Sequence, residues 1–511
     1  MTSNEVNGAS EAPRTSPSAH VHLNPDIVVC GDPIEQEKGS NDMTFRAQHH
    51  HHQHRDRPSH ESQDDDAVHT HYSGATWGEE STVGDVNRGL KADESVSNEA
   101  NGQLDVEEKG ELRDHKHRRP KLSLAQRTLR ITWAWFPINM STGSIATLLP
   151  RQPYTFDGLL TIGKIFYITN LVLFCLFTTL IIARFVRKPR ALSTSLHHPS
   201  ESFFFGSFWV SVGLIILGMQ VYGVPECGPW LVRAMRVIFW IYFAMSGIIA
   251  VLQYHIIFQV EKLGQSDAMP AWILPAYPLL VIGVLASSIA QTQPPQSALE
   301  LIIAGIAAQG LGWILAIFIY TVYFTRLIHS DMPPPSVRPG MYMSVGPAAY
   351  TCAGLLALGK GAMSSLPPGF LGIEALNVGQ LWYAISVPAA LFLWLLAAWF
   401  SALSTVACVK KMRTMTFSLQ WWSFIFPNAG LALATIQIGN ALESKGIKIA
   451  GVVITVILIP LWIFNAIMHV KAIWQRELLA PGRDMGVDDV NEKHDIKVER
   501  KRMRKMRLKH K

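Results

Sequence analysis

Small neutral polar residues interrupt several long apolar stretches of this 511-residue chain, and they are the residues best able to contact a solute there. One stretch contains Asn139, Ser141 and Thr142, and later stretches contain Ser344 and Asn428. No carboxylate lies at the centre of any of these stretches. Because a ring of carboxylates would favour cations, the pattern is compatible with a path for anions. The same residue types are common where membrane helices pack together, and for any single Ser or Thr that role is favoured.

Prolines recur inside alternate apolar stretches, at intervals of roughly two, one and one multiples of a 70-residue unit. The four are Pro137, Pro278, Pro347 and Pro427. A proline removes a backbone donor and kinks a helix, which a membrane tolerates where the bend lines a cavity. The spacing predicts five helical hairpins whose first helices are kinked around a common axis. The second hairpin offers only Gly206 at the equivalent place, and Pro388 and Pro460 lie in the other helices, so simple abundance of membrane proline stays an alternative.

Basic residues at the mouths of the apolar stretches agree with an anion path. Arg338 stands at the start of one stretch, where it is placed to attract an anionic substrate. Motifs for catalysis are missing: there is no GxSxG, no HExxH and no P-loop, and the five cysteines lack metal-ligand spacing. The sequence therefore predicts a protein that is not an enzyme, with no catalytic residue, no cofactor, no metal site and no nucleic-acid partner.

Ten apolar segments must position these residues. Each is long enough to cross the apolar core of a bilayer, which needs roughly 20 helical residues. Strands of alternating polarity, which a β-barrel would need, are absent from the pattern. The sequence therefore predicts an all-α integral membrane protein with ten transmembrane helices. The segments are 128–149, 158–185, 201–222, 229–258, 270–290, 298–325, 339–361, 378–408, 417–440 and 447–475.

Basic residues are concentrated in the even-numbered loops between these segments. The second loop contains Arg187 and Lys188 and the eighth contains Lys410 and Lys411, whereas the third and fifth loops contain no Lys or Arg. Because short basic loops remain in the cytoplasm, the even loops and both chain ends are predicted to be cytoplasmic. An even number of spans agrees with two ends on one side of the membrane.

The chain ends differ in composition from the apolar part. Residues 1–125 are polar and rich in His and Ser, and they have too little apolar surface to fold, so we expect a disordered cytoplasmic tail. Their run of histidines, 49–54, is typical of a solvated low-complexity tract, although metal binding is an alternative. Residues 126–479 are expected to form the transmembrane domain, and 480–511 a basic cytoplasmic tail that can contact anionic lipid headgroups of the bilayer.

Seven short sequences between the first and the tenth segment resemble the tellurite-resistance/dicarboxylate transporter family, and within it the fungal malic acid permeases. They occur in order over about 350 residues, and together they are specific although each alone is weak. The sequences are Met140-Ser141-Thr142-Gly143, Thr161-Ile162-Gly163-Lys164-Ile165, Pro270-Ala271-Trp272-Ile273-Leu274-Pro275, Gln309-Gly310-Leu311-Gly312, Arg338-Pro339-Gly340-Met341, Val345-Gly346-Pro347 and Trp422-Ser423-Phe424-Ile425-Phe426-Pro427-Asn428.

The resemblance implies ten transmembrane helices, arranged as five hairpins around a central pseudo-fivefold pore, usually in a homotrimer. It also implies that a phenylalanine of the ninth segment closes the pore. By its position in the Phe-Pro motif that residue is Phe426, with Phe424 as the weaker candidate. Packing of Phe426 against lipid or a neighbouring helix is the alternative.

Members of the family transport different anions, and the resemblance to the malate-permease branch predicts transport of malate and similar C4-dicarboxylates across the plasma membrane. Sulfite efflux is one alternative, and an uncoupled gated anion channel is another. The first segment departs from the permease pattern by containing Pro137, which leaves the substrate open.

Overall fold

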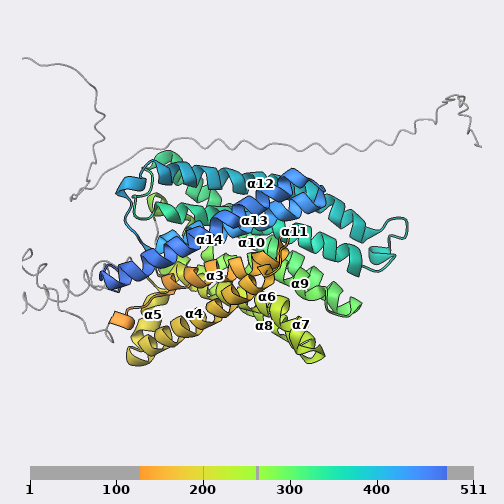
Figure 1. Cartoon of the computed structure of the whole chain (residues 1–511), viewed down its shortest axis with the longest axis horizontal. Helices are drawn as coiled ribbons and strands as arrows, with labels where there is room; N and C mark the ends of the chain where they lie inside the picture. Colours follow the sequence, from red (N-terminus) through yellow and green to blue (C-terminus); the bar gives the residue numbers. More distant parts are fainter. Residues whose placement is uncertain (1–126, 199–200, 261–263, 480–511) are drawn as a thin grey trace, which may run out of the picture. The chain divides into compact units, whose positions relative to one another are not determined.

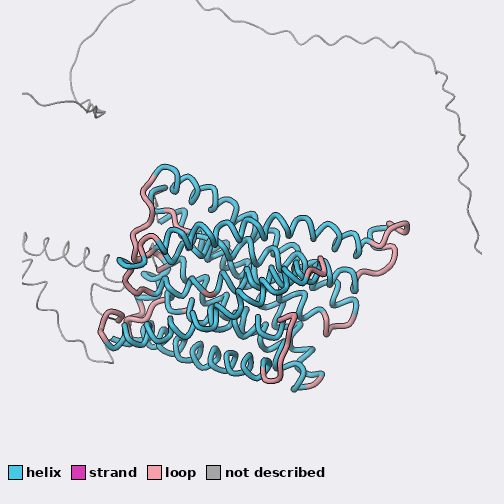
Figure 2. The backbone as a smooth tube through the Cα atoms, turned by 45° about the horizontal axis from the view of Figure 1, so that its top comes forward, coloured by secondary structure: helices cyan, strands magenta, loops and turns pink. Residues whose placement is uncertain are grey.

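The computed structural model describes residues 127–198, 201–260 and 264–479, all of which belong to one compact unit, Ala92–Lys511. Figure 2 shows that these residues form helices and loops and contain no strand. The expected tails, 1–125 with its histidine run and 480–511, lie outside the described residues. The all-α prediction is confirmed for the part of the chain that is described.

Within the described part of the chain, eight helical segments are long and apolar enough to cross a membrane. Three of these segments combine an α-helix with short 3-10 or π turns. Their α-helices are α6 (Phe205–Gly218), α9 (Tyr277–Ala290) and α11 (Val345–Ser365). The other five are α4 (Leu159–Arg187), α8 (Pro229–Val260), α10 (Pro295–His329), α12 (Val378–Val409) and α14 (Lys445–Trp474).

The two remaining predicted segments, 128–149 and 417–440, contain shorter helices. These are α3 (Pro137–Leu148), with 12 residues, and α13 (Phe426–Ala441), with 16. Both fall short of the roughly 20 residues that a straight α-helical crossing needs. The short helices α5 (Arg190–Leu196) and α7 (Val224–Cys227) lie in connections.

Five helices pack against one another in a closed series. Going along the chain, α3 contacts α6, α6 contacts α9, α9 contacts α11 and α11 contacts α13, and α13 returns to α3. We call these five the inner ring; their labels can be followed in Figure 1. The other long helices pack on its outside: α4 against α3, α8 and α10 against α9, α12 against α11, and α14 against α13.

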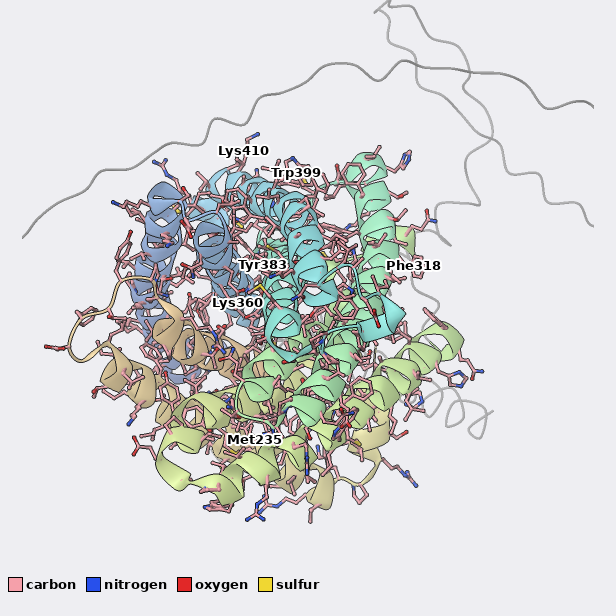
Figure 3. All side chains as sticks on the ribbon, turned by 90° about the vertical axis from the view of Figure 1, so that its right-hand side faces the viewer. Met235, Phe318, Lys360, Tyr383, Trp399 and Lys410 are labelled. Atoms are coloured by element: carbon pink, nitrogen blue, oxygen red, sulfur yellow. The ribbon has the colours of Figure 1, made fainter. Side chains whose placement is uncertain are left out.

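Burial follows this division. In the segments that contain α9 and α11, about nine-tenths of the residues in the 18-residue apolar stretch are buried (94% and 89%). In α4 and in α14 only 17% of the corresponding residues are buried. Phe318 of α10 and Trp399 of α12 are exposed on the outside of the bundle, as Figure 3 shows. Such apolar surface suits contact with lipid. The inner ring is therefore the core of the fold, and the outer helices present their apolar sides to the surroundings.

Every helix of the inner ring begins after a 3-10 turn. The turns are Trp133–Trp135, Ser202–Phe204, Pro270–Ala276, Arg338–Ser344 and Leu419–Phe424. In four of the five, the predicted proline falls within the first three residues of the following α-helix, where proline does not break the helix. The junction before α6 has the same change of helix type without a proline, so the structural repeat is more regular than the proline pattern.

Side chains from neighbouring helices donate hydrogen bonds to carbonyl groups at these junctions. Pro347 has no N–H for the Met343 carbonyl four residues earlier, and the Tyr277 hydroxyl donates to that carbonyl instead. Pro275 likewise offers no N–H within the 3-10 turn to the carbonyl of Trp272, which accepts from the Tyr254 hydroxyl at 3.0 Å. Such replacement matters because an unsatisfied backbone group in a bilayer costs several kcal/mol.

The junctions before α3 and α13 receive donors in the same way, and the junction before α11 receives a second one. The Phe136 carbonyl accepts from Ser211, and the Ser344 carbonyl accepts from Tyr320. The carbonyls of the turn before α13 accept from Asn465 and Ser141, which lie on α14 and α3. The breaks in the inner ring are therefore held in place by side chains from other helices.

Gly206 allows the junction before α6 to approach the next one. A Cβ atom at this position would overlap the backbone carbonyl of Leu274. We expect Gly206→Ala to lower the free energy of unfolding by about 1–3 kcal/mol, the usual cost of overpacking, because main-chain atoms cannot rotate away. The measurement is the thermal unfolding midpoint in detergent.

Gly247→Ala is the matched control, since Gly247 lies within α8 and a Cβ there would meet no atom within 4 Å. Equal midpoints for the two variants would contradict the proposed contact between the junctions.

Candidate functional site

Phe426 lies inside the inner ring and is held there by two tyrosines. It is the first residue of α13, and its side chain is 3% exposed. Its ring stacks on that of Tyr350 from α11, with centroids 4.9 Å apart and planes at 19°, and it packs at 5.8 Å against Tyr277 from α9. The ring neighbours of α13 are α11 and α3, so a contact with α9 reaches across the interior of the ring. We call these three residues the aromatic clamp.

A small cavity adjoins the clamp at the end where the inner helices begin. Residues from four of the five junctions line it, and their side chains are almost all apolar. The lining is Pro137, Met140, Leu274, Tyr277, Met343, Trp422, Ser423, Phe426 and Pro427. Its free volume is about 10 Å³, about what a single water molecule needs. Beside Phe426 the interior of the ring is therefore closed to any larger solute.

Ser423 is the polar side chain of this lining with the most freedom to bind a solute. Its hydroxyl oxygen is buried and has no hydrogen-bond partner within the described ranges. A buried hydroxyl without a partner carries a desolvation penalty of about 1–3 kcal/mol, which a water or a passing anion would relieve. The other hydroxyl of the lining, on Tyr277, is used by the Met343 carbonyl.

The three polar residues predicted in the first segment bond to neighbouring helices. Asn139 donates to the carbonyl and side-chain oxygens of Asn170 on α4, at 3.1 and 3.0 Å. Ser141 donates to the Trp422 carbonyl, and Thr142 accepts from the indole of Trp462 on α14. All three are fully buried. The bonds favour the helix-packing role for these side chains, and their contact with an anion stays a prediction.

Ser344 and Asn428 are engaged in a similar way. The Ser344 hydroxyl donates to the Met341 carbonyl one turn earlier, at 2.7 Å. The amide of Asn428 donates to the Phe424 carbonyl, and its oxygen accepts from Ser401 on α12. Asn428 therefore ties the start of α13 to an outer helix, close to the clamp residue Phe426.

Arg338 is half-buried and bonded to main-chain oxygens. Its guanidinium donates to the carbonyl of Pro333 at 2.8 Å and to that of Ala407, near the end of α12, at 3.0 Å. These bonds fix the loop before α11 to the end of α12. The geometry favours an anchoring role for Arg338, and attraction of substrate by its charge stays a prediction.

The four predicted prolines lie at one level of the inner ring. Pro137 and Pro427 line the cavity directly, and Pro278 follows the lining residue Tyr277. Pro347 removes the donor that Tyr277 replaces. The prolines therefore lie at the cavity or next to residues of the clamp, and kinks around a common axis stay a prediction.

Sequence reasoning missed the two tyrosines of the clamp as functional residues. Tyr350 was noticeable only as a polar residue of its segment, and Tyr277 only because it precedes a proline. Pairing of aromatic rings between distant helices leaves no local pattern.

Among the described residues, no group of three or more His, Cys, Asp or Glu side chains could hold a metal ion.

Comparison with known proteins places this site in context. Residues 130–470 match the SLAC1 family, described as voltage-dependent anion channel. The chain is 35% identical over 377 residues to a malic acid transport protein of Schizosaccharomyces pombe, covering 73% of this chain and 85% of that protein. It is 29% identical over 351 residues to a sulfite efflux pump of Trichophyton rubrum, covering 67% of this chain and 91% of the pump.

Removing the Tyr277 hydroxyl tests the support of the clamp. We expect Tyr277→Phe to cost about 1–3 kcal/mol of stability, because the Met343 carbonyl would be left without a donor in a buried place. The thermal unfolding midpoint in detergent measures this loss. Tyr154→Phe, at a tyrosine that is 50% exposed, is the control and should leave the midpoint unchanged. A Tyr277→Phe midpoint equal to that of the control would show that another group satisfies the carbonyl.

Proposed function

Since the chain belongs to the SLAC1 family of voltage-dependent anion channels, we propose that it moves malate and related C4-dicarboxylate anions through the inner ring, across the plasma membrane. Transport of anions by a multi-pass membrane protein follows from the family and from the apolar helices. The preference for malate is supported by the malic acid transport protein, which at 35% identity is more similar to this chain than the sulfite efflux pump at 29%.

The observation that carries the proposal is the aromatic clamp. Phe426 reaches across the interior of the ring and leaves room beside it for no more than a water molecule. A C4-dicarboxylate is far larger than a water molecule, so it passes only after the ring of Phe426 has moved. In this proposal Phe426 is the gate, and the structure described above has the gate closed.

The energy that holds the gate closed is modest. An aromatic pair contributes about 0.5–1.5 kcal/mol beyond the burial of its area, and Phe426 makes two such pairs. Phe426 stands at the junction between a 3-10 turn and α13, directly before Pro427, whose missing N–H leaves one intrahelical bond fewer at this end of the helix.

The topology that we propose contains ten crossings. The 3-10 turns before α3 and α13 lengthen these helices, and with them the chain forms five pairs of one inner and one outer helix around a pseudo-fivefold pore. Both chain ends are then cytoplasmic, and the clamp lies towards the cytoplasmic side, where the inner helices begin. A homotrimer is proposed from the family resemblance, and the exposed apolar sides of the outer helices are compatible with it.

Two other functions have support of their own. Sulfite efflux is supported by the coverage of the sulfite pump, of which 91% is matched. An uncoupled channel is supported by the description of the family. Both use the same ring and gate, so they differ from the first proposal in the anion and in the coupling to protons.

Purified protein in liposomes separates these functions. We expect uptake of radiolabelled malate that saturates, rises with an inward proton gradient and is little affected by added sulfite. Sulfite flux without malate flux would replace the malate proposal by sulfite transport. Large currents that depend on voltage and do not respond to the proton gradient would identify an uncoupled channel.

Truncation of the gate tests the role of Phe426. We expect Phe426→Ala to raise the anion leak at rest, because the ring that fills the interior is removed. Conductance per protein in liposomes or in whole-cell recordings measures the leak. Phe392→Ala is the control, since Phe392 lies on the outer helix α12 and is 79% exposed. Equal leak from both variants, at equal amounts of protein in the membrane, would refute the gate.

A further inference from the structure

A single arginine reaches into the interior of the inner ring at the end opposite to the cavity. Arg151 ends the short turn Leu149–Arg151 that follows α3. Its Nη2 atom donates to the hydroxyl of Ser288 on α9, at 3.4 Å. The ring neighbours of α3 are α6 and α13, so a side chain that bonds to α9 reaches across the interior.

The charge of Arg151 is not compensated by an acidic residue. Within residues 127–198, 201–260 and 264–479, the ion pairs are Lys164–Glu226 and Arg184–Glu201. The titratable side chains that interact with Arg151 are Tyr222 and Tyr350, whose phenols are neutral at physiological pH. A partly buried charge loses hydration, and without a counter-charge no ion pair offsets that loss. Such a charge therefore favours an anion beside it.

Arg151 also keeps donors for a ligand. A guanidinium has five N–H groups, and in the described structure Arg151 uses one for the Thr147 carbonyl and one for Ser288. The bond to Thr147 caps the end of α3, a role that many arginines play and that needs a single donor. The remaining donors form the flat fork that binds a carboxylate or a similar oxyanion at two points.

Other arginines of the bundle differ in this respect. Arg184 is paired with Glu201 at 2.6 Å. Arg326 donates to the Ala268 carbonyl, and Arg338 donates to two carbonyls at the opposite end of the inner helices. Arg236 donates to the Ser297 hydroxyl, as Arg151 does to Ser288, but it joins the outer helices α8 and α10. Arg151 is thus distinguished by its place over the interior of the ring.

The charge of Arg151 also acts on the aromatic clamp. Tyr350 interacts with the charge of Arg151 and stacks on Phe426. An anion that has passed Phe426 from the cavity therefore next meets the guanidinium, and an anion that enters from the other end meets the guanidinium first. A cation on this side lowers the energy of an anion close to the narrowest point.

We propose that Arg151, together with the hydroxyl of Ser288, forms a binding site for the transported anion on the far side of Phe426. The site takes small oxyanions, with a carboxylate of a C4-dicarboxylate or a sulfite group received by the guanidinium. The inference rests on the proposed function, because it assumes that the interior of the ring is the path of the anion.

Anion-dependent thermal stabilisation tests the site without requiring transport. A ligand that binds the folded state raises the unfolding midpoint. The full-length protein in detergent is heated with sodium malate, sodium sulfite or sodium chloride at equal ionic strength. We expect malate to raise the midpoint of the unchanged protein, with a half-saturating concentration that increases roughly tenfold or more in Arg151→Gln, the loss of about one charge-assisted hydrogen bond.

Two further variants separate binding from capping of α3. Arg151→Lys keeps the charge but loses the fork, so its half-saturating concentration should lie between those of the unchanged protein and Arg151→Gln. Arg236→Gln removes the same charge from a similar Arg–Ser contact outside the ring and should leave the malate titration unchanged. A lower midpoint in Arg151→Gln with an unaltered titration would leave capping as the role of Arg151 and overturn the proposal.

A flux measurement distinguishes this inference from the proposed function. In liposomes with the Phe426→Ala variant, adding Arg151→Gln should raise the half-saturating anion concentration roughly tenfold. If malate neither stabilises nor crosses, but sulfite does both and depends on Arg151, the site holds and the malate proposal fails. If malate crosses with the same half-saturation in both variants, the transport proposal holds and the site at Arg151 is refuted.

Discussion

The structure depends on the need to satisfy backbone carbonyls where the inner helices break. Each inner helix changes from a 3-10 turn to an α-helix, and proline removes the N–H that the Met343 and Trp272 carbonyls would otherwise accept. Within a bilayer, water cannot replace those donors. The hydroxyls of Tyr277 and Tyr254 do so, and they come from other helices of the bundle. A break in one helix therefore requires a second helix in a fixed position, and this requirement orders the ring.

The same requirement positions the aromatic clamp, which we propose as the gate. Tyr277 must face the Met343 carbonyl, so its ring lies at the level of the junctions and inside the ring of helices. Phe426, which follows the last of the five 3-10 turns, packs against that ring and against Tyr350. A tyrosine that satisfies the backbone thus also supports the phenylalanine that fills the interior. In the proposed function, packing and closure therefore share one set of side chains, which lies at the breaks of the inner helices.

The sequence predicted the long apolar helices and the positions of four junctions, but it predicted less of the site. Long apolar runs predicted 158–185, which the structure has as Leu159–Arg187, because hydrophobic length is a local property. Prolines predicted four junctions, but the junction at Gly206 is defined by the approach of Leu274, a residue far along the chain. The hydrogen-bond partners of Asn139 and Asn428, and the pairing of Phe426 with Tyr277, likewise depend on contacts between distant helices. Family resemblance supplied Phe426, while Tyr277 and Tyr350 have no local signature.

A preference of the ring for anions depends both on the absence of charged side chains from the cavity and on the charges close to it. The cavity lining has no charged side chain, so an ion of either sign would lose its hydration there at a similar cost. A neutral, apolar constriction by itself favours small or weakly hydrated solutes, whatever their sign. The sign must then be set by charges near the constriction, and the guanidinium of Arg151 interacts with Tyr350 at the far side of the clamp. At an effective dielectric constant near 20, one charge acts on another about 4 Å away with about 4 kcal/mol. In the proposed function, a single uncompensated cation is therefore enough to make the ring favour anions strongly, while the proposed apolar gate decides only when they pass.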